Sequence, residues 1–263
     1  MLDFVLLIPC YDNIDGLSIS INSIQYPSNT FEILIIDDGS VVPIALDNFN
    51  IVSAKMPIKI IRLEKNQGIV HALNTGLKLL QHRKDFKYIA RLDCGDICAK
   101  DRFVKQVNYL NANSDIHLLG SWCKFIDHKK QSSYLYKTKT THNDILKEMN
   151  FKCSFMHPTV MFRASVILSV GVYPTNYSLT EDYAYFWKIL NKHKVAILPE
   201  ILTTIEINPN SLSAKNYKKQ LLQRIKVINQ FSNHFLFKRI GILMLAFRYI
   251  LPTKFVLLIK YLR

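Results

Sequence analysis

The acidic side chains that could take part in chemistry stand in three short segments of the sequence: Asp37-Asp38, Asp93 to Asp96, and Glu181-Asp182. The first two segments directly follow apolar runs, where carboxylates repel one another unless cations or hydrogen-bond donors compensate them. A Mg²⁺ or Mn²⁺ ion together with a diphosphate would do so, because these cations prefer carboxylate oxygens. Alone, each segment is also typical of a turn or of a helix N-terminus.

Short β-branched runs precede the first two acidic segments and alternate with runs of helical periodicity. The expected strands are Phe4–Ile8, Phe31–Ile36, Ile58–Leu63 and Tyr88–Leu92, and the expected helices between them are Leu17–Gln25 and Ile69–Gln81. This alternation predicts an α/β fold with a doubly wound, mostly parallel sheet flanked by helices. Ligands of such sheets bind at the carboxyl ends of the strands, where the acidic segments stand.

The second half of the chain is less regular. We expect a helix over Arg102–Leu110, a polar loop over 128–150, a strand over Met156–Phe162, and helices over Ala164–Val170 and Glu181–Leu190. With 263 residues, 49% of them apolar, the chain is long enough for one large α/β domain with an appendage.

Composition and missing motifs exclude several classes of protein. The sequence has no uninterrupted apolar run of membrane-spanning length, and Phe4–Ile8 is too short and lacks the basic leader of a signal peptide. The five cysteines form no CxxC pair, which favours a reduced, cytoplasmic compartment. No GxGxxG, GxxxxGK[ST] or GxSxG pattern occurs, so dinucleotide oxidoreductases, P-loop proteins and α/β-hydrolases lose their main support.

Five motifs, in order along the chain, resemble glycosyltransferase family 2. They are Ile8-Pro9-Cys10-Tyr11-Asp12, Ile35 to Ser40, Asn66-Gln67-Gly68, Tyr88 to Asp96, and His157 to Arg163 followed by Glu181-Asp182. The resemblance covers roughly residues 3 to 205. It implies a GT-A fold, a nucleoside-diphosphate sugar as donor, and inversion at the anomeric carbon.

The resemblance also implies roles for single residues in binding the donor. Pro9 and Tyr11 would border the nucleobase, and Asp38 would accept a hydrogen bond from a uracil ring. Asn66 and Gly68 would approach the nucleotide. Arg91 would reach the diphosphate, although an arginine in a strand is more often part of a structural ion pair.

The remaining assigned roles concern the metal ion and the acceptor. Asp93 and Asp96 occupy the metal-binding region, with Asp93 also near the donor's ribose, but Gly95 stands where many members have the carboxylate that contacts the metal. Asp182 matches the catalytic base. Glu181 would orient the acceptor or cap its helix, and His157 would line the acceptor or donor pocket, unless it is a structural histidine.

A second departure from the family pattern follows Leu202. The arginine that members often use for the diphosphate is missing from Ile205-Glu206-Ile207-Asn208, and Lys215, Lys218 or Lys219 are candidate substitutes.

The C-terminal segment is strongly basic. Residues 215–263 contain eleven Lys and Arg residues and no Asp or Glu, whereas the chain as a whole has a net charge of +14. Apolar residues recur at helical spacing from Leu236 to Leu251, and Pro252 would separate this helix from another over Lys254–Leu262. We therefore divide the chain into a catalytic domain (1–212) and an amphipathic tail (213–263) that binds an anionic membrane surface. Alternatively the stripe packs on the domain or on a second copy in a homodimer. No nucleic-acid motif accompanies it.

The sequence as a whole predicts a peripheral enzyme on the cytoplasmic face of a membrane. The family resemblance implies that it transfers a hexose or N-acetylhexosamine from a nucleotide sugar, expected to be UDP-linked, to a hydroxyl of a lipid-linked saccharide during surface polysaccharide synthesis. One alternative is a sugar-phosphate nucleotidyltransferase, which is disfavoured because the loop Pro9–Gly16 has no Lys or Arg. Another is a membrane-bound scaffold with a decayed site.

Overall fold

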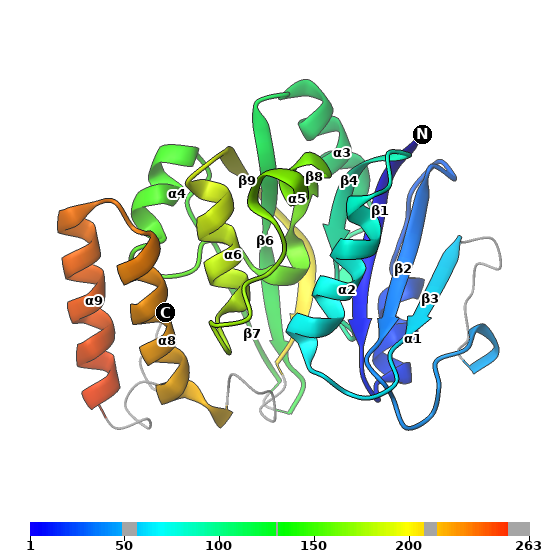
Figure 1. The fold of residues 1–263 in the computed structure, drawn as a ribbon, viewed down its shortest axis with the longest axis horizontal. Helices are drawn as coiled ribbons and strands as arrows, with labels where there is room; N and C mark the ends of the chain where they lie inside the picture. Colours follow the sequence, from blue (N-terminus) through cyan, green and yellow to red (C-terminus); the bar gives the residue numbers. More distant parts are fainter. Residues whose placement is uncertain (49–56, 130, 208–214, 252–263) are drawn as a thin grey trace.

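The computed structural model describes residues 1–48, 57–129, 131–207 and 215–251 (Figure 1). Within these ranges the strands form one nine-stranded sheet in the order β3-β2-β1-β4-β8-β6-β9-β5, with β7 paired to β6. Helices cover both faces of this sheet, which confirms the α/β fold expected from the sequence.

The N-terminal half has the predicted alternation of strands and helices. Its parallel strands are β1 (Leu2–Cys10), β2 (Phe31–Asp37), β3 (Ile58–Arg62) and β4 (Phe86–Arg91), and its helices are α1 (Ile14–Asn22), α2 (Ile69–Gln81) and α3 (Arg102–Ala112). A short 3₁₀ helix, η1 (Leu46–Asn48), follows β2, and a short strand, β5 (Ile97–Cys98), precedes α3. Apolar runs form buried strands here because helices cover both faces of the sheet.

The second half differs from the prediction in several places. Two long strands, β6 (Ile116–Asp127) and β9 (Lys194–Glu206), pair in parallel, and neither was expected. The predicted loop over 128–150 is wrong, because it contains β7 (Ser132–Tyr136) and α4 (His142–Glu148). The strand expected over Met156–Phe162 is shorter: a 3₁₀ turn, η2 (His157–Thr159), precedes β8 (Met161–Arg163), because Pro158 lacks the N–H that a central strand needs.

Two further helices of this half were predicted and are present. They are α5 (Ser165–Val170) and α6 (Glu181–Leu190), and the bounds of α6 coincide with the expected ones. Strand β8 runs antiparallel to both β4 and β6, so it joins the parallel N-terminal half to the second half of the sheet.

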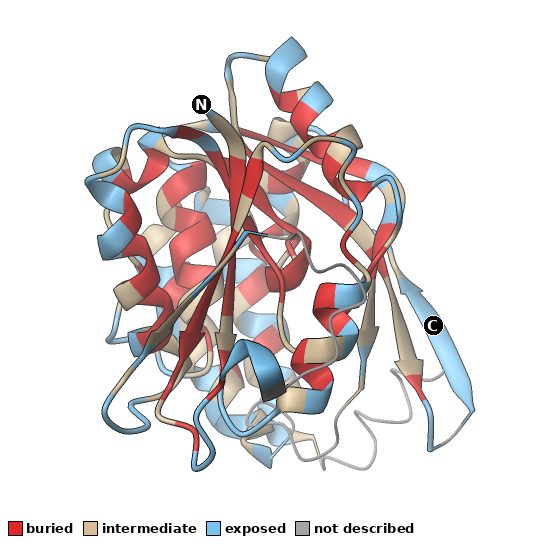
Figure 2. Ribbon diagram, turned by 90° about the vertical axis from the view of Figure 1, so that its right-hand side faces the viewer, coloured by how far each residue is buried: buried red, intermediate tan, exposed pale blue. Residues whose placement is uncertain are grey.

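Alternate residues of β1 show how the core is divided between the two faces of the sheet. Val5 and Leu7 pack with α2 and α6 on one face, whereas Phe4, Leu6 and Ile8 pack with α1 and α3 on the other. All five side chains are fully buried, and Figure 2 shows the central strands buried along most of their length. This rigid sheet fixes the positions of the loops at its carboxyl edge.

Two long helices end the described chain. Helices α8 (Tyr217–Phe231) and α9 (Phe235–Ile250) pack side by side beyond α6 (Figure 1). Leu221, Val227 and Ile228 of α8 and Leu245 of α9 belong to the same buried core as α6. Within the described ranges, no helix combines the length and apolar character needed to cross a membrane.

The two sequence-based divisions of the C-terminal segment stay predictions. The boundary between 212 and 213 and the helix expected over Lys254–Leu262 both lie outside the described residues.

Candidate active site

Asp38 binds the loop that follows β3. Its buried carboxylate accepts hydrogen bonds from the backbone N–H groups of Gln67 at 3.0 Å and Gly68 at 2.8 Å. A carboxylate that accepts two backbone bonds is held in one orientation. The two motifs that contain Asp38 and Asn66-Gln67-Gly68, which are far apart in sequence, are therefore one structural unit.

The turn before this loop depends on Asp37 and Gly39. The Asp37 carboxylate is fully buried, accepts from the backbone N–H of Ser40 at 2.9 Å and forms an ion pair with Arg62 at 3.0 Å. Gly39 has a φ of +72°, and a Cβ there would lie 2.4 Å from the backbone carbon of Lys65. Only glycine allows so close an approach of the two loops.

Tyr11, Pro9 and Asn66 border the same region. Tyr11 is exposed, and the negative charge of Asp12 raises the pKa of its phenol. Asn66 is also exposed, and its side-chain oxygen accepts from the N–H of Gly68 at 3.1 Å. Pro9 is half-buried, and its carbonyl oxygen accepts a weak hydrogen bond from the Cys94 thiol at 3.4 Å. Tyr11 and Asn66 thus present free surface to a ligand.

Arg91 is fully buried behind Asp93. Its Nη2 donates to Asp93 at 2.5 Å, and its Nη1 donates to the carbonyl oxygens of Leu7 and Leu92. The expected contact between Arg91 and a diphosphate would require the guanidinium to leave these partners. In this structure Arg91 instead orients the Asp93 carboxylate, whose side chain is 34% exposed.

His157 continues this chain of hydrogen bonds. Its Nε2 accepts from Arg91 Nε at 3.4 Å and lies at hydrogen-bond distance, 2.8 Å, from the Tyr173 hydroxyl. An acceptor nitrogen carries no proton, so the ring is neutral, and burial together with the charge of Arg91 lowers its pKa to about 3. His157 is only 8% exposed, so its position favours a role in fixing Arg91 over direct contact with an acceptor.

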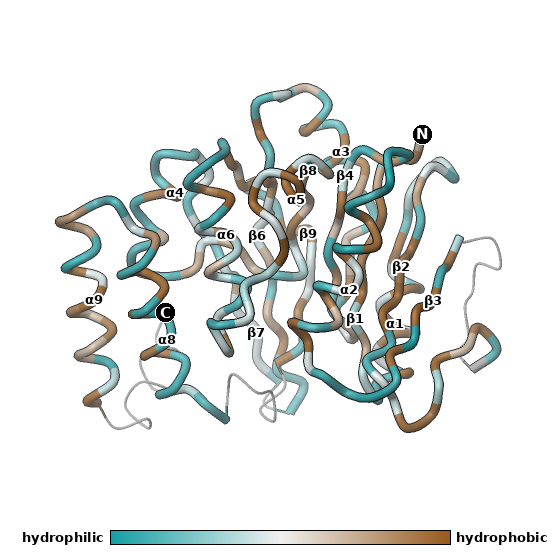
Figure 3. Tube along the Cα trace, in the orientation of Figure 1, coloured by the Kyte–Doolittle hydropathy of each residue, from teal (hydrophilic) through white to brown (hydrophobic). Residues whose placement is uncertain are grey.

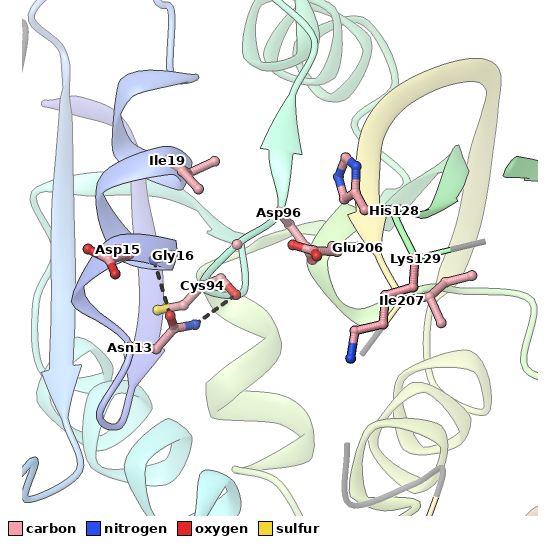
Figure 4. Close-up of a pocket in the computed structure, with 11 residues that line it drawn as sticks. Asn13, Asp15, Gly16, Ile19, Cys94, Asp96, His128, Lys129, Glu206 and Ile207 are labelled. Carbon is pink, nitrogen blue, oxygen red and sulfur yellow. Dashed lines mark hydrogen bonds between the residues drawn. The ribbon is translucent and has the colours of Figure 1, made fainter. Parts of the chain in front are cut away.

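Asp96 lies apart from this chain, on the wall of a pocket of about 430 Å³ (Figure 4). The pocket lies between α1, the turn 93–96, the turn after β6 and the end of β9, where Asp15, Lys129 and Glu206 also line it. Asp96 is 6% exposed, and burial, followed by the charge of Asp93, raises its pKa to about 8.

The fit of a divalent cation rests mainly on Asp93. Among the described residues, no group of three or more His, Cys, Asp or Glu side chains is arranged to hold a metal ion. Gly95 contributes no carboxylate, and burial and the raised pKa disfavour Asp96 as a ligand. Asp93 offers an accessible carboxylate oxygen, and the space beside Gly95 is open. These residues fit a Mg²⁺ or Mn²⁺ ion only if a diphosphate supplies most of its ligands.

Glu181 and Asp182 form the first turn of α6, and both are half-buried. Asp182 accepts a hydrogen bond from the N–H of Tyr183 at 2.7 Å. Burial raises the pKa of Asp182, and it raises that of Glu181 to about 7, with the charges of Asp182 and Asp93 adding to the effect on Glu181. A carboxylate with a raised pKa is a better proton acceptor, as a general base requires.

The structure brings the acidic segments to one edge of the sheet. Strand β1 pairs with β2 at Cys10 and Asp37 and with β4 at Leu7 and Arg91, so the segments after β2 and β4 emerge on either side of β1. The charge of Asp93 affects the pKa of both Glu181 and Asp182, which indicates that α6 opens onto the same site.

The sequence did not reveal three further residues of this site. Asn74 on α2 exchanges two hydrogen bonds of 2.8 Å with the backbone of Tyr173, whose hydroxyl fixes His157. Arg224 on α8 lies over the ring of Tyr183, next to Asp182. Each of these residues lies in a segment with the ordinary composition of a helix or a loop, so no local sequence pattern distinguished it from its neighbours.

Solved structures with the same architecture identify the fold of this protein. S. aureus TarS in complex with UDP-GlcNAc has a TM-score of 0.66 with 15% identity, over 93% of this chain and 72% of that one. The mannosyltransferase PcManGT from Pyrobaculum calidifontis, in complex with GDP-Man and Mn²⁺, has a TM-score of 0.65 with 16% identity, over 92% and 68% of the two chains. The fold is that of GT-A glycosyltransferases.

Sequence comparison gives the family. The model of glycosyl transferase family 2 matches residues 5–169, which is more than half of the chain, and the chain belongs to this family. A relative from Erwinia amylovora, the amylovoran biosynthesis glycosyltransferase AmsE, is 31% identical over 76% of this chain and 74% of its own length. The UDP-Gal:alpha-D-GlcNAc-diphosphoundecaprenol beta-1,3-galactosyltransferase of Escherichia coli is 29% identical over 85% and 82%.

The protein is therefore a glycosyltransferase, as both of these relatives are by name. This result decides against the sugar-phosphate nucleotidyltransferase that the sequence had left as an alternative.

Proposed function

We propose that this enzyme transfers a hexose or N-acetylhexosamine from a UDP-linked donor to a hydroxyl of a lipid-linked saccharide, with inversion, during surface polysaccharide synthesis. The main support is the convergence of Asp38, Asp93 and Asp182 at one edge of the sheet. The relative from Escherichia coli, whose name includes a UDP-linked donor and a diphosphoundecaprenol acceptor, supports both substrate classes.

Each of these carboxylates has a separate role in the proposed reaction. Asp38 holds the 66–68 loop against the nucleotide, with Tyr11 beside the base. Asp93, oriented by Arg91, faces the ribose and the diphosphate. Asp182 takes the proton from the acceptor hydroxyl as its oxygen attacks the anomeric carbon, a contribution of about 10²–10⁴ in rate. A Mg²⁺ or Mn²⁺ ion bound by Asp93 and the diphosphate would neutralise charge on the leaving group.

Asp182→Asn tests the base. We expect transfer to fall by about 10²-fold or more, while UDP binding measured by calorimetry stays unchanged because Asp182 does not contact the nucleotide. Asp115→Asn, at an exposed ion pair with Lys194, is a matched control that should keep full activity. Full activity in Asp182→Asn would remove Asp182 as the base.

The donor and the cation are tested by binding. Calorimetry with a panel of nucleotide sugars, with and without Mn²⁺, should give binding of UDP-sugars that Mn²⁺ tightens. When an acceptor is added to the donor-bound enzyme, the enzyme should release UDP. A protein that binds no nucleotide sugar would instead be the catalytically decayed scaffold.

The enzyme would attach peripherally to the cytoplasmic face of an anionic membrane, and the outer face of α9 supports attachment to a membrane surface. Leu236, Ile240, Leu243, Phe247 and Ile250 recur at helical spacing and are exposed, and Figure 3 shows this apolar character along the helix. Lys and Arg residues flank this face, and each contributes about 1 kcal/mol near an anionic leaflet. The opposite face packs on the protein through Gly241 and Leu245.

Vesicle co-sedimentation tests this attachment. Leu243→Glu should abolish binding to vesicles that contain anionic phospholipid, because residue 243 is 69% exposed on the apolar face. Leu168→Glu, at a residue 71% exposed on α5, is the matched control and should bind as well as the wild type. If Leu243→Glu instead converts a dimer into a monomer, the face belongs to a homodimer.

A further inference from the structure

Arg224 on α8 is a half-buried arginine with few partners. Its Nη2 donates to the carbonyl oxygen of Phe151 at 3.4 Å, the long end of the hydrogen-bond range. Its guanidinium carbon lies 5.4 Å from the centre of the Tyr183 ring. Its Nε is buried and finds no hydrogen-bond partner among the described residues. Buried N–H groups are nearly always paired, so this guanidinium has unused donor capacity. An anionic ligand would meet its Nη groups, because the Nε atom is enclosed.

Arg224 lies close to the proposed catalytic base. Tyr183, over whose ring the guanidinium lies, directly follows the proposed base Asp182 in α6. Burial, the largest influence, raises the pKa of Asp182, and the positive charge of Arg224 opposes it. The guanidinium is therefore close enough to Asp182 to interact with its charge.

The geometry of an inverting reaction indicates which of the two substrates, donor or acceptor, lies beside the Arg224 guanidinium. In an inverting displacement the attacking oxygen and the leaving group are on opposite sides of the anomeric carbon. Asp182 must be on the side of the attacking oxygen, so a cation beside Asp182 is on the acceptor side. The diphosphate of the donor leaves toward Asp93, on the other side.

We propose that Arg224 binds the phosphate group through which the acceptor saccharide is joined to its lipid. This inference rests on the proposed lipid-linked acceptor. The planar guanidinium matches the oxygens of a phosphate group and can donate two parallel hydrogen bonds to it.

The order of the C-terminal helices supports a route for the lipid. Helix α8 packs against α6 on one side and α9 on the other (Figure 1). The base, the phosphate-binding arginine and the exposed apolar face of α9 therefore follow one another across the molecule. A lipid-linked sugar has the same order of groups: hydroxyl, phosphate, hydrocarbon chain.

Calorimetry on the full chain saturated with UDP tests this subsite, because UDP fills the diphosphate site of the donor. The probes are geranyl diphosphate, inorganic pyrophosphate and, as an uncharged control, geraniol. We expect the wild type to bind geranyl diphosphate, and Arg224→Gln to bind it at least tenfold more weakly while UDP affinity is unchanged. Arg224→Lys should bind at an intermediate level. Lys226→Gln, at an exposed lysine of the same helix, should match the wild type.

Several results would overturn the proposal. They are failure of the UDP-saturated wild type to bind geranyl diphosphate, wild-type affinity for it in Arg224→Gln, and loss of UDP affinity in Arg224→Gln. If Arg224 only tunes the base, the pH profile of transfer shifts in Arg224→Gln while the affinity for geranyl diphosphate stays the same. Pyrophosphate binding equal to that of geranyl diphosphate would assign the subsite to a free anion. UDP binding by the wild type, measured in the same samples, reports on the proposed function separately.

Discussion

Replacing Gly39 by alanine should damage nucleotide binding as well as stability, and Gly171 provides a matched comparison. The two glycines have φ angles of +72° and +77°, so an alanine at either position costs about 1–3 kcal/mol in backbone strain. At Gly171 the nearest atom to an added Cβ is the side-chain Nζ of Lys188, 3.9 Å away, which is ordinary van der Waals contact. At Gly39 the nearest atoms are backbone, with the Lys65 carbon at 2.4 Å.

The expected loss of stability in Gly39→Ala follows from the 2.4 Å between the added Cβ and the Lys65 carbon. Ordinary van der Waals contact begins at 3.4 Å, so the loop after β3 must move away by roughly 1 Å, the difference between 3.4 and 2.4 Å. The bonds from Gln67 and Gly68 to Asp38, now 3.0 and 2.8 Å, would then exceed hydrogen-bond length. Each bond to a charged group contributes about 1.5–3 kcal/mol. Because water replaces part of this, we expect Gly39→Ala to lose about 2–4 kcal/mol more than Gly171→Ala.

Urea unfolding and UDP calorimetry measure the two effects. Gly171→Ala should lose only the strain energy and keep the wild-type affinity for UDP. Gly39→Ala should lose more stability and bind UDP at least tenfold more weakly. If both variants lose equal stability and keep equal UDP affinity, Gly39 does not couple the Asp38 turn to the nucleotide loop.

Three other changes test separate parts of the structure. Arg91→Met should lower the free energy of unfolding by about 2–4 kcal/mol in urea, because Asp93 loses its buried partner; wild-type stability would contradict this. The folded-state pKa of Glu181 is about 7, above its ordinary 4.5, so stability should fall as pH rises through this window. Glu181→Gln should reduce that fall between pH 5 and pH 8 in thermal unfolding, and an unchanged pH dependence would refute the assignment. Gly241→Ala would place a Cβ 1.9 Å from the Asn150 carbonyl oxygen, so protease cleavage of α9 should accelerate; equal cleavage rates would show that α9 does not depend on this contact.

Much of the N-terminal half could be predicted because its signals are local. The β-branched runs of β1 to β4 and the helical periodicity of α2 are visible within short windows, and the bounds of α2 coincide with the prediction Ile69–Gln81. The acidic segments after β2 and β4 were also recognisable, because parallel strands bring their carboxyl ends to one edge.

The second half could not be predicted in the same way because its strands depend on each other. Strands β6 and β9 are separated by most of the second half and are stabilised by their parallel pairing, which no local pattern encodes. Strand β7 pairs with the end of β6, beyond the part of β6 that pairs with β8, and this partner comes from outside the 128–150 segment. The expectation of a loop over 128–150 failed for this reason.

The sequence by itself determined the α/β class, the family and the carboxylates around which the site is built, because residue type and order along the chain carry this information. Only the tertiary structure decided what those residues contact. It buries Arg91 between Asp93 and His157, and it brings Arg224 from a helix near the C-terminus over the ring of Tyr183, the residue after Asp182. Such contacts join residues far apart in the chain, so they exist only once the packing of the helices on the sheet is fixed.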